Sequence, residues 1–149
     1  MRKSEYWKNT AANPVSVAIG KIYRLRLARL GAKLGFSIPL NTFGKGLSIA
    51  HIGTIVVNSH ARIGERCRIH AGVNIGTAAG FADKAPVIGN DVYIGPGAKI
   101  FGDIKIANQI AIGANAVVTK DFMQPGISIA GVPAVKIGDK GNPDYVQRN

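Results

Sequence analysis

The sequence has little cysteine, few aromatic residues, few acidic residues and no long apolar run. Cys67 is the single cysteine among 149 residues, which excludes an intramolecular disulfide and favours a reducing compartment. No apolar run approaches the length of a membrane span, and the basic N-terminus lacks the uninterrupted apolar region of a signal peptide. We therefore expect a cytoplasmic protein. Aromatic residues make up 7% of the chain and 19 residues are glycine, so we expect a core of small and β-branched side chains.

Basic residues outnumber acidic ones by 19 to 8, which gives a formal net charge of +11. Such an excess suits nucleic acid, an anionic membrane surface or a small polyanionic ligand. The sequence has no basic patch interleaved with aromatic residues and no recognised nucleic-acid motif, so no nucleic-acid partner is expected. A phosphate-bearing cofactor and a solvated surface account for the charge.

An aliphatic residue recurs at every sixth position over two long stretches of the chain. A second small or apolar residue follows each of them four positions later, and glycine follows several of them directly. The aliphatic positions are Val57, Ile63, Ile69, Ile75, Ile88, Ile94, Ile100, Ile106, Ile112 and Val118, and the positions four later are Ala61, Cys67, Val73, Ala79, Val92, Ala98, Ile104, Ile110, Ala116 and Phe122. Chance does not produce so long a regular pattern.

A period of six fits neither an α-helix, with its period of 3.6, nor a simple strand, with its period of two. A short strand followed by a tight turn, with Gly or Asn where φ is positive, does produce it. Three such units close a triangular coil of about 18 residues with the aliphatic positions inside, and successive coils stack as a solenoid. We therefore predict an all-β fold, a parallel β-helix over residues 37–137. A helical segment (1–36) precedes it and a loosely ordered tail (138–149) follows.

Two interruptions of the repeat are where we expect the chemistry. The step from Ile75 to Ile88 is thirteen residues rather than twelve, which predicts that residues 77–86 form a loop extruded from a corner. Upstream of Val57 the phase slips as well, and His51 lies within the slip.

The N-terminal segment has a helical pattern. Asn13 and Pro14 predict a helix start, and Gly35 predicts its end. Apolar residues follow at a spacing of three to four, and basic residues occupy much of the remaining surface. We expect this helix to pack across the open end of the β-helix; the alternative is an interfacial helix on anionic lipid at the inner face of the membrane.

Residues 37–137 resemble the bacterial hexapeptide-repeat acetyltransferases. Within that family they are most similar to serine acetyltransferases and to O-acetyltransferases of surface-polysaccharide gene clusters. The motifs that carry the resemblance are GKGLSIAHIGTIVVN, IGPGAKIFG, IGANAVVTKD and AGVPA. It implies a left-handed coil and acetyl transfer from acetyl-CoA. We expect no metal and, from the three-sided shape of the coil, a homotrimer.

His51 is the predicted catalytic residue. In serine acetyltransferases a His in a matching setting is the general base that takes the proton of the acceptor hydroxyl as its oxygen attacks the thioester. An imidazole has a pKa near the working pH and suits this task. His60 and His70 are the competing candidates.

The chain departs from the serine pattern around the predicted acceptor site. Ala50 replaces the Asp before the catalytic His, Ala85 replaces a second His before Pro86, and Phe36 aligns with the carboxylate that orients the imidazole. Lys84 could bind a substrate carboxylate, but no group is evident for an ammonium. We therefore expect a sugar hydroxyl of a surface polysaccharide or its precursor as the acceptor, with serine as the alternative.

Coenzyme A is expected along stacked turns. Gly95-Pro96-Gly97 and Gly113-Ala114 are 18 residues apart, one full coil, so their exposed backbone groups should stack at one corner and hold the pantetheine arm. The resemblance assigns Thr119 and Lys120 to coenzyme A. Lys136 and Lys140 are further candidates for its phosphates, and Gly76-Thr77 for the oxyanion donor.

A three-sided prism presents flat faces suited to cyclic threefold packing. We expect a site shared between subunits, in which His51 of one chain faces the loop 77–86 of the next. Two other classes stay open. One is a zinc-binding β-helix like the γ-type carbonic anhydrases, although their His-x4-His spacing is absent here. The other is a β-helix without catalysis.

Overall fold

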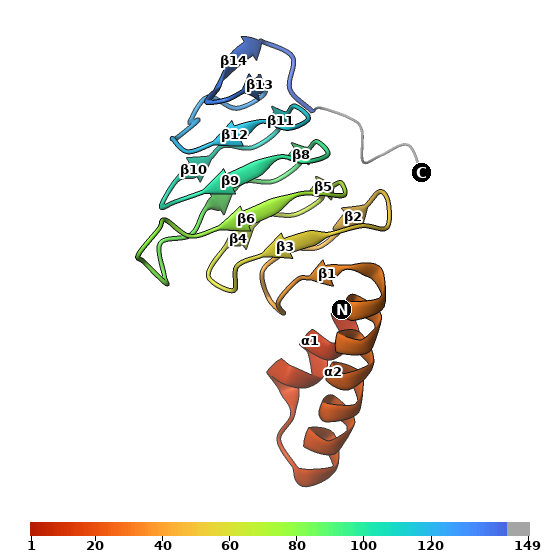
Figure 1. Ribbon diagram of the computed structural model, residues 1–149. Coiled ribbons are helices and arrows are strands. Elements are labelled where there is room, and N and C mark those ends of the chain that lie inside the picture. The colour runs from red at the N-terminus through yellow and green to blue at the C-terminus, as the bar shows by residue number, and fades with distance from the viewer. Residues whose placement is uncertain (143–149) are drawn as a thin grey trace.

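The computed structural model describes residues 1–142, which form two helices below a stack of short strands (Figure 1). The helices are α1 (Arg2–Thr10) and α2 (Pro14–Leu34). The strands form three sheets, named here A, B and C, and together they enclose a single core.

Each sheet collects one strand from each coil. Sheet A contains β1 (Phe36–Ser37), β3 (Ile55–Val57), β6 (Asn74–Gly76), β9 (Lys99–Phe101) and β12 (Val117–Val118). Sheet B contains β4 (Arg62–Ile63), β7 (Val87–Ile88) and β10 (Lys105–Ile106). Sheet C contains β2 (Ser48–Ile49), β5 (Arg68–Ile69), β8 (Tyr93–Ile94), β11 (Ala111–Ile112), β13 (Ser128–Gly131) and β14 (Ala134–Gly138). All pairings are parallel except that of β13 with β14, which closes the upper end.

The strand register confirms the predicted coil. Tyr93 of β8 lies opposite Ala111 of β11, one turn of 18 residues later, and the other two sheets repeat this spacing in the same part of the stack. All ten predicted aliphatic positions are buried, none more than 4% exposed. The inward-facing stack of aliphatic side chains is therefore the core of the fold.

The predicted loop is a true insertion into one coil. Asn74 of β6 pairs with Lys99 of β9, a step of 25 residues instead of 18, and the extra residues leave the prism between β6 and β7. Ala79 lies on this loop and is exposed, because the insertion interrupts the repeat that would have turned it inward. Buried Pro86 takes the corresponding place two residues before Ile88.

A second, smaller insertion contains His51. Ile49 pairs with Ile69 and Val57 pairs with Ile75, so the chain takes eight residues from sheet C to sheet A in the first coil where the next coil takes six. The phase slip seen in the sequence is thus a turn widened by two residues.

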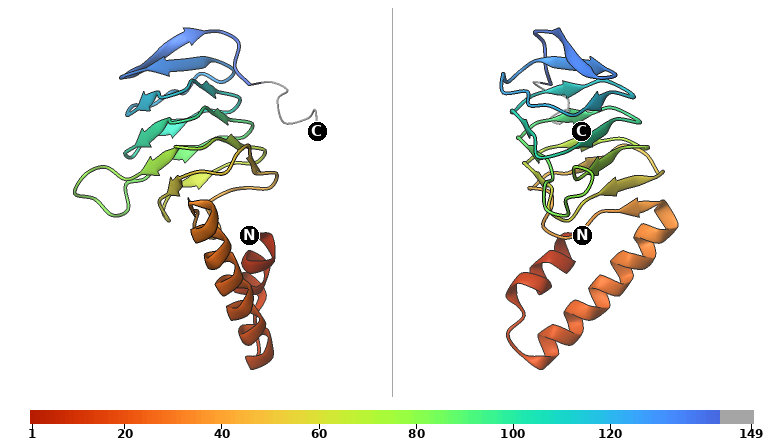
Figure 2. Two further views of the ribbon diagram at one scale, coloured as in Figure 1. Left: turned by 45° about the vertical axis from the view of Figure 1, so that its right-hand side comes forward. Right: turned by 60° about the vertical axis from the view of Figure 1, so that its left-hand side comes forward.

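The N-terminal segment differs from its prediction in two ways. The helix α2 starts after Asn13, whose side chain accepts from the Ser16 N–H, and ends at Gly35 with φ 78°, as expected. A second helix, α1, was not predicted; it packs on α2 where Trp7 meets Gly20, and Ser4 Oγ donates to Tyr23 O at 3.1 Å. The pair projects from the end of the prism instead of lying across it (Figure 2). No helix within residues 1–142 has the length and apolarity that a membrane crossing requires.

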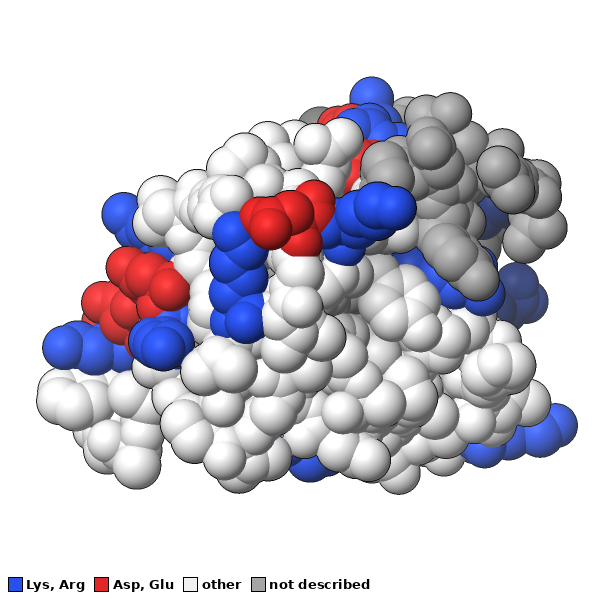
Figure 3. Space-filling model, turned by 90° about the horizontal axis from the view of Figure 1, so that it is seen from above, with Lys and Arg blue, Asp and Glu red and all other residues white. Residues whose placement is uncertain are grey.

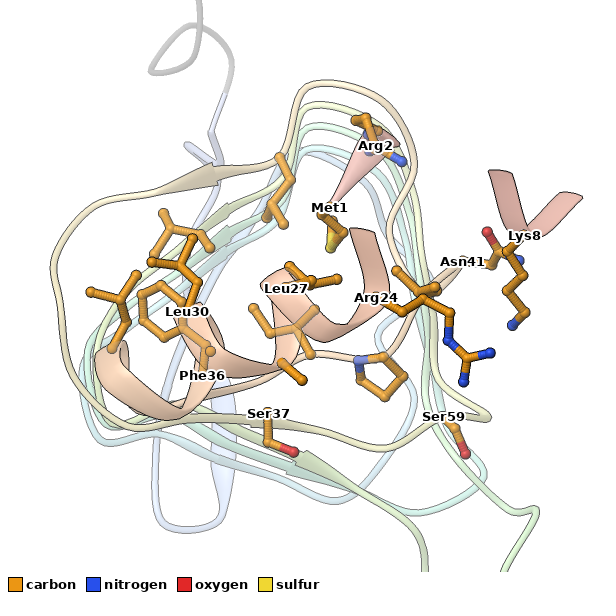
Figure 4. A pocket seen from close by; sticks show the side chains of 18 of the residues that line it. Met1, Arg2, Lys8, Arg24, Leu27, Leu30, Phe36, Ser37, Asn41 and Ser59 are labelled. Atoms are coloured by element: carbon orange, nitrogen blue, oxygen red, sulfur yellow. The ribbon is translucent and has the colours of Figure 1, made fainter. Parts of the chain in front are cut away.

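The lower end of the core is consequently only partly covered. A cavity of about 1110 Å³ lies between the helices and the first coil, lined by apolar side chains such as Leu27, Leu30 and Phe36 (Figure 4). Arg2, Arg24 and Lys8 lie toward one side of it. His51 is not among its lining residues.

The chain beyond β14 folds back onto the prism as far as it is described. Asn142 is buried, and its side-chain amide donates to Asp91 O at 2.9 Å. The expected tail 138–149 is therefore packed up to Asn142, and its remainder lies outside the described residues.

Cys67 offers a direct check of the inward register. Its side chain is fully buried, and burial raises the pKa of the thiol to about 12. Because the thiolate is the reactive form, we expect Ellman's reagent to leave the native protein unlabelled over minutes and to label one thiol after unfolding in guanidinium. Rapid labelling of one thiol per chain in native buffer would contradict the register.

Candidate active site

The turns that lead from sheet C to sheet A form one edge of the prism, named here the C–A edge. His51 follows β2 on this edge and His70 follows β5 one coil above it. Gly95-Pro96-Gly97 follows β8, and Gly113-Ala114 follows β11. The predicted base and the predicted coenzyme-binding turns therefore occupy a single column.

His51 is exposed in its widened turn. The backbone before it is fixed, since the Ala50 N–H donates to Ile69 O at 3.1 Å, and the Gly53 N–H donates to Leu34 O at 3.3 Å. Within residues 1–142 the imidazole of His51 forms no hydrogen bond, and its ring contact is with His70. A base in this position is open to a hydroxyl arriving from solvent.

His70 is the neighbour of His51 in space. The two ring centroids are 5.9 Å apart, and the Tyr93 ring lies 5.0 Å from the His70 ring. Burial lowers the pKa of His70 below its ordinary value, and the charges of Arg68 and His51 lower it further. His70 is therefore an uncharged imidazole at neutral pH.

The two glycine turns stack as predicted. The Asn115 N–H donates to Pro96 O at 2.8 Å, and the Gly97 N–H donates to Ala71 O at 2.9 Å in the coil below. A Cβ on Gly95 would come within 2.8 Å of backbone atoms of the next coil, so only glycine allows this approach. The result is a narrow column of small residues in which Pro96 and Ala114 are exposed while Gly95 is buried, and its role in holding coenzyme A remains a prediction.

The remaining predicted residues lie on a different edge, where sheet A leads to sheet B. Gly76 ends β6 there and Thr77 follows it, while Thr119 and Lys120 follow β12. The loop 77–86 leaves from the same edge; its Lys84 lies 4.3 Å from the Phe81 ring centroid, while Ala85 is buried at the loop's base. Within one chain, sheet A separates these residues from His51.

Two further candidates are placed away from His51 as well. His60 is exposed after β3, on the edge between sheets A and B, so it does not join His51 and His70. Lys136 forms an ion pair with Asp139 at 2.5 Å. Residues 1–142 contain no group of three His, Cys, Asp or Glu side chains that could hold a metal ion.

The charge is distributed without a dominant patch on the upper end of the molecule. Figure 3 shows Lys and Arg scattered over this face, several of them beside Asp or Glu, with uncharged side chains over much of the rest. Such a distribution offers single cations for phosphate groups.

Sequence reasoning missed the pairing of His51 with His70. The first coil has a step of 20 residues, which places residue 70 beside residue 50. This neighbourhood follows from the sequence only when the length of the irregular first coil is already known. The contribution of Tyr93 and Arg68 to the same cluster was missed for the same reason.

Comparison with known proteins supports the family resemblance and the fold. No protein-family model matches the chain. It is 38% identical over 101 residues to a serine acetyltransferase of Mycobacterium tuberculosis, covering 67% of this chain and 44% of that protein. A solved serine acetyltransferase from Brucella abortus in complex with coenzyme A matches with a TM-score of 0.63 and 36% identity, over 68% of this chain and 40% of that one. Soybean serine acetyltransferase complexed with serine matches with a TM-score of 0.71 and 29% identity, over 90% of this chain and 53% of that one.

The chain thus spans about half, or less, of the length of these relatives. Their shared architecture is the left-handed parallel β-helix, which confirms the predicted fold. The chain belongs to the hexapeptide-repeat acetyltransferase family and, within it, is similar to the serine acetyltransferases.

Proposed function

We propose that this protein is an acetyl-CoA-dependent O-acetyltransferase with His51 as its general base. The observation that carries the proposal is the single column on the C–A edge, where an exposed imidazole lies in line with stacked glycine turns. The coenzyme A complex of the Brucella abortus relative supports the choice of donor.

The chemistry follows from the position of His51. Its free ring nitrogen takes the proton of the acceptor hydroxyl while that oxygen attacks the thioester carbonyl. The tetrahedral intermediate then collapses, the C–S bond breaks, and the thiolate of coenzyme A receives the proton from the imidazolium. The oxyanion needs a backbone donor, for which the Gly76-Thr77 region remains the candidate.

L-Serine is the acceptor that the comparisons favour. The relatives described above are named serine acetyltransferases, and the soybean structure contains serine. The expectation of a sugar acceptor has no such support, so serine replaces it as the leading candidate.

A sugar hydroxyl is retained as the second candidate because of two residues. Ala50 and Ala85 stand where the serine pattern has Asp and His, and Ala50 directly precedes the proposed base. A neutral polyol has no ammonium group to bind. The loss of these polar groups would therefore weaken the binding of a sugar less than the binding of serine.

The activity is tested by thiol release from acetyl-CoA with L-serine and a panel of sugars as acceptors. We expect turnover on serine, and a decrease of about 10²–10⁴-fold in His51→Ala, the usual value of a general base. Circular dichroism should show that the variant keeps its strands. Turnover on sugars alone would transfer the proposal to the second acceptor, and equal rates in His51→Ala would refute the role of this residue.

We infer that the working unit is a homotrimer with sites between subunits. This arrangement is supported by the separation of His51 from the loop 77–86, which lie on opposite sides of sheet A in one chain. A neighbouring subunit could bring its loop to the C–A edge.

The trimer predicts complementation between two inactive variants. One carries His51→Ala, and the other has residues 78–84 replaced by a short glycine linker. The two variants are unfolded and refolded together in equal amounts. About a quarter of the sites should then be intact, because each site needs His51 from one subunit and the loop 77–86 from the next, and half of the subunits carry each. An active monomer, or no recovery in verified mixed trimers, would contradict the shared site.

We also propose a peripheral contact between the helical segment and an anionic membrane surface. Within residues 1–36 eight residues are basic and Glu5 is the single acidic one. On α2, Val15, Ile22 and Leu25 are exposed by 69%, 52% and 53% respectively. Cationic and apolar side chains together suit the interface of an anionic bilayer.

Sedimentation with lipid vesicles tests this contact. We expect binding to phosphatidylglycerol vesicles that is lost at high salt, no binding to phosphatidylcholine vesicles, and weaker binding of Ile22→Glu/Leu25→Glu. Thr54→Glu, a charge change on an exposed residue outside the helices, is the control. Equal sedimentation with both lipids, or none with either, would refute it.

A further inference from the structure

His70 lies between two small residues on the C–A edge. The register of sheet C places it in one column with Ala50 in the coil below and Gly95 in the coil above. Both flanking residues are small, so the imidazole can lie along the edge toward His51, whose ring centroid is 5.9 Å away.

Among the described residues, one nitrogen of His70 has no hydrogen-bond partner. Its Nε2 is buried and forms no hydrogen bond within residues 1–142. A buried polar atom left unpaired destabilises a fold, and such atoms persist where they serve a function. A neutral imidazole offers one ring nitrogen as an acceptor, and burial together with Arg68 and His51 keeps His70 in this form.

Within the described part of the chain, no hydrogen bond orients the imidazole of His51, as a general base requires. A base is held by a hydrogen bond to one ring nitrogen, which fixes the tautomer and directs the other nitrogen at the substrate. The chain has Phe36 where the serine acetyltransferase pattern places a carboxylate, and a phenyl ring accepts no such bond. The described ring that contacts His51 and carries a nitrogen able to accept from it is that of His70.

We propose that His70 is the positioning residue for His51: one ring N–H of His51 donates to the Nε2 of His70 when an acceptor is bound. This inference rests on the proposed role of His51 as the base. The donated bond directs the lone pair of the second His51 nitrogen at the acceptor hydroxyl. When His51 takes up the hydroxyl proton, the neutral His70 stabilises the imidazolium without accepting the proton, which passes on to the thiolate of coenzyme A.

The variant His70→Leu separates positioning from structural support. Leucine fills similar space and removes the unpaired nitrogen, so the melting temperature should stay equal or rise. The kcat should fall about 10- to 100-fold, as when an orienting partner is removed from an imidazole, while the KM for acetyl-CoA changes little. His70→Gln keeps an acceptor and should recover part of the lost kcat. His60→Leu is the matched control on another edge and should leave kcat unchanged.

A spectroscopic readout makes the test independent of turnover. Nitrogen-15 spectra of the His51 imidazole, recorded with serine and coenzyme A bound, should show one dominant tautomer in the native protein and a mixture in His70→Leu. A His70→Leu variant with native kcat and an unchanged tautomer would overturn the inference while His51→Ala remains inactive. If His51→Ala retains full activity, the proposed function itself fails.

Discussion

The structure depends on the closure of each coil around its buried aliphatic side chains. Three strands of two or three residues have almost no stability alone, and they persist because parallel hydrogen bonds link every coil to its neighbours. A coil of fixed length has no room inside for extra residues. Any insertion must therefore leave at a corner, and the two insertions of this chain are the turn of His51 and the loop 77–86. The same constraint that builds the core thus determines where reactive groups can be displayed.

The corners also explain how the column on the C–A edge arises. Turns that repeat once per coil are stacked by the register, so residues a full coil apart in sequence become neighbours. Glycine at positions 95 and 97 lets successive coils of this column approach closely, since a Cβ there would collide with the next coil. An extended ligand with repeating polar groups matches such a column better than it matches a closed pocket. The large cavity near the helices is apolar in its depth and does not include His51.

The regular part of the fold could be predicted because one aliphatic residue in every six points inward and forms the core. The aliphatic positions, the extruded loop and the limits of α2 were all predicted from the sequence. The helix α1 was missed because its mostly polar sequence has no apolar stripe, and its contacts with α2 and with the first coil stabilise it instead. The neighbourhood of His51 and His70 could not be predicted, since it depends on the two additional residues in one turn and hence on the register of the first coil. In the proposed homotrimer, side chains from two subunits would bind the acceptor, and a single chain does not show that arrangement.

The departures at Ala50 and Ala85 matter most for how this protein differs from its relatives. Both remove polar groups near the proposed acceptor position, while the proposed base is retained. His70 then supplies, from the neighbouring coil, the hydrogen-bond acceptor that His51 would otherwise lack. The central claim is that coenzyme A and His51 meet on the C–A edge. A crystal structure of the protein with coenzyme A tests it most directly: the account predicts the pantetheine arm along the turns of Gly95 and Gly113, with its sulfur separated from His51 by the space of one hydroxyl group. Coenzyme A bound along another edge, with its thiol remote from every His51 of the assembly, would contradict it.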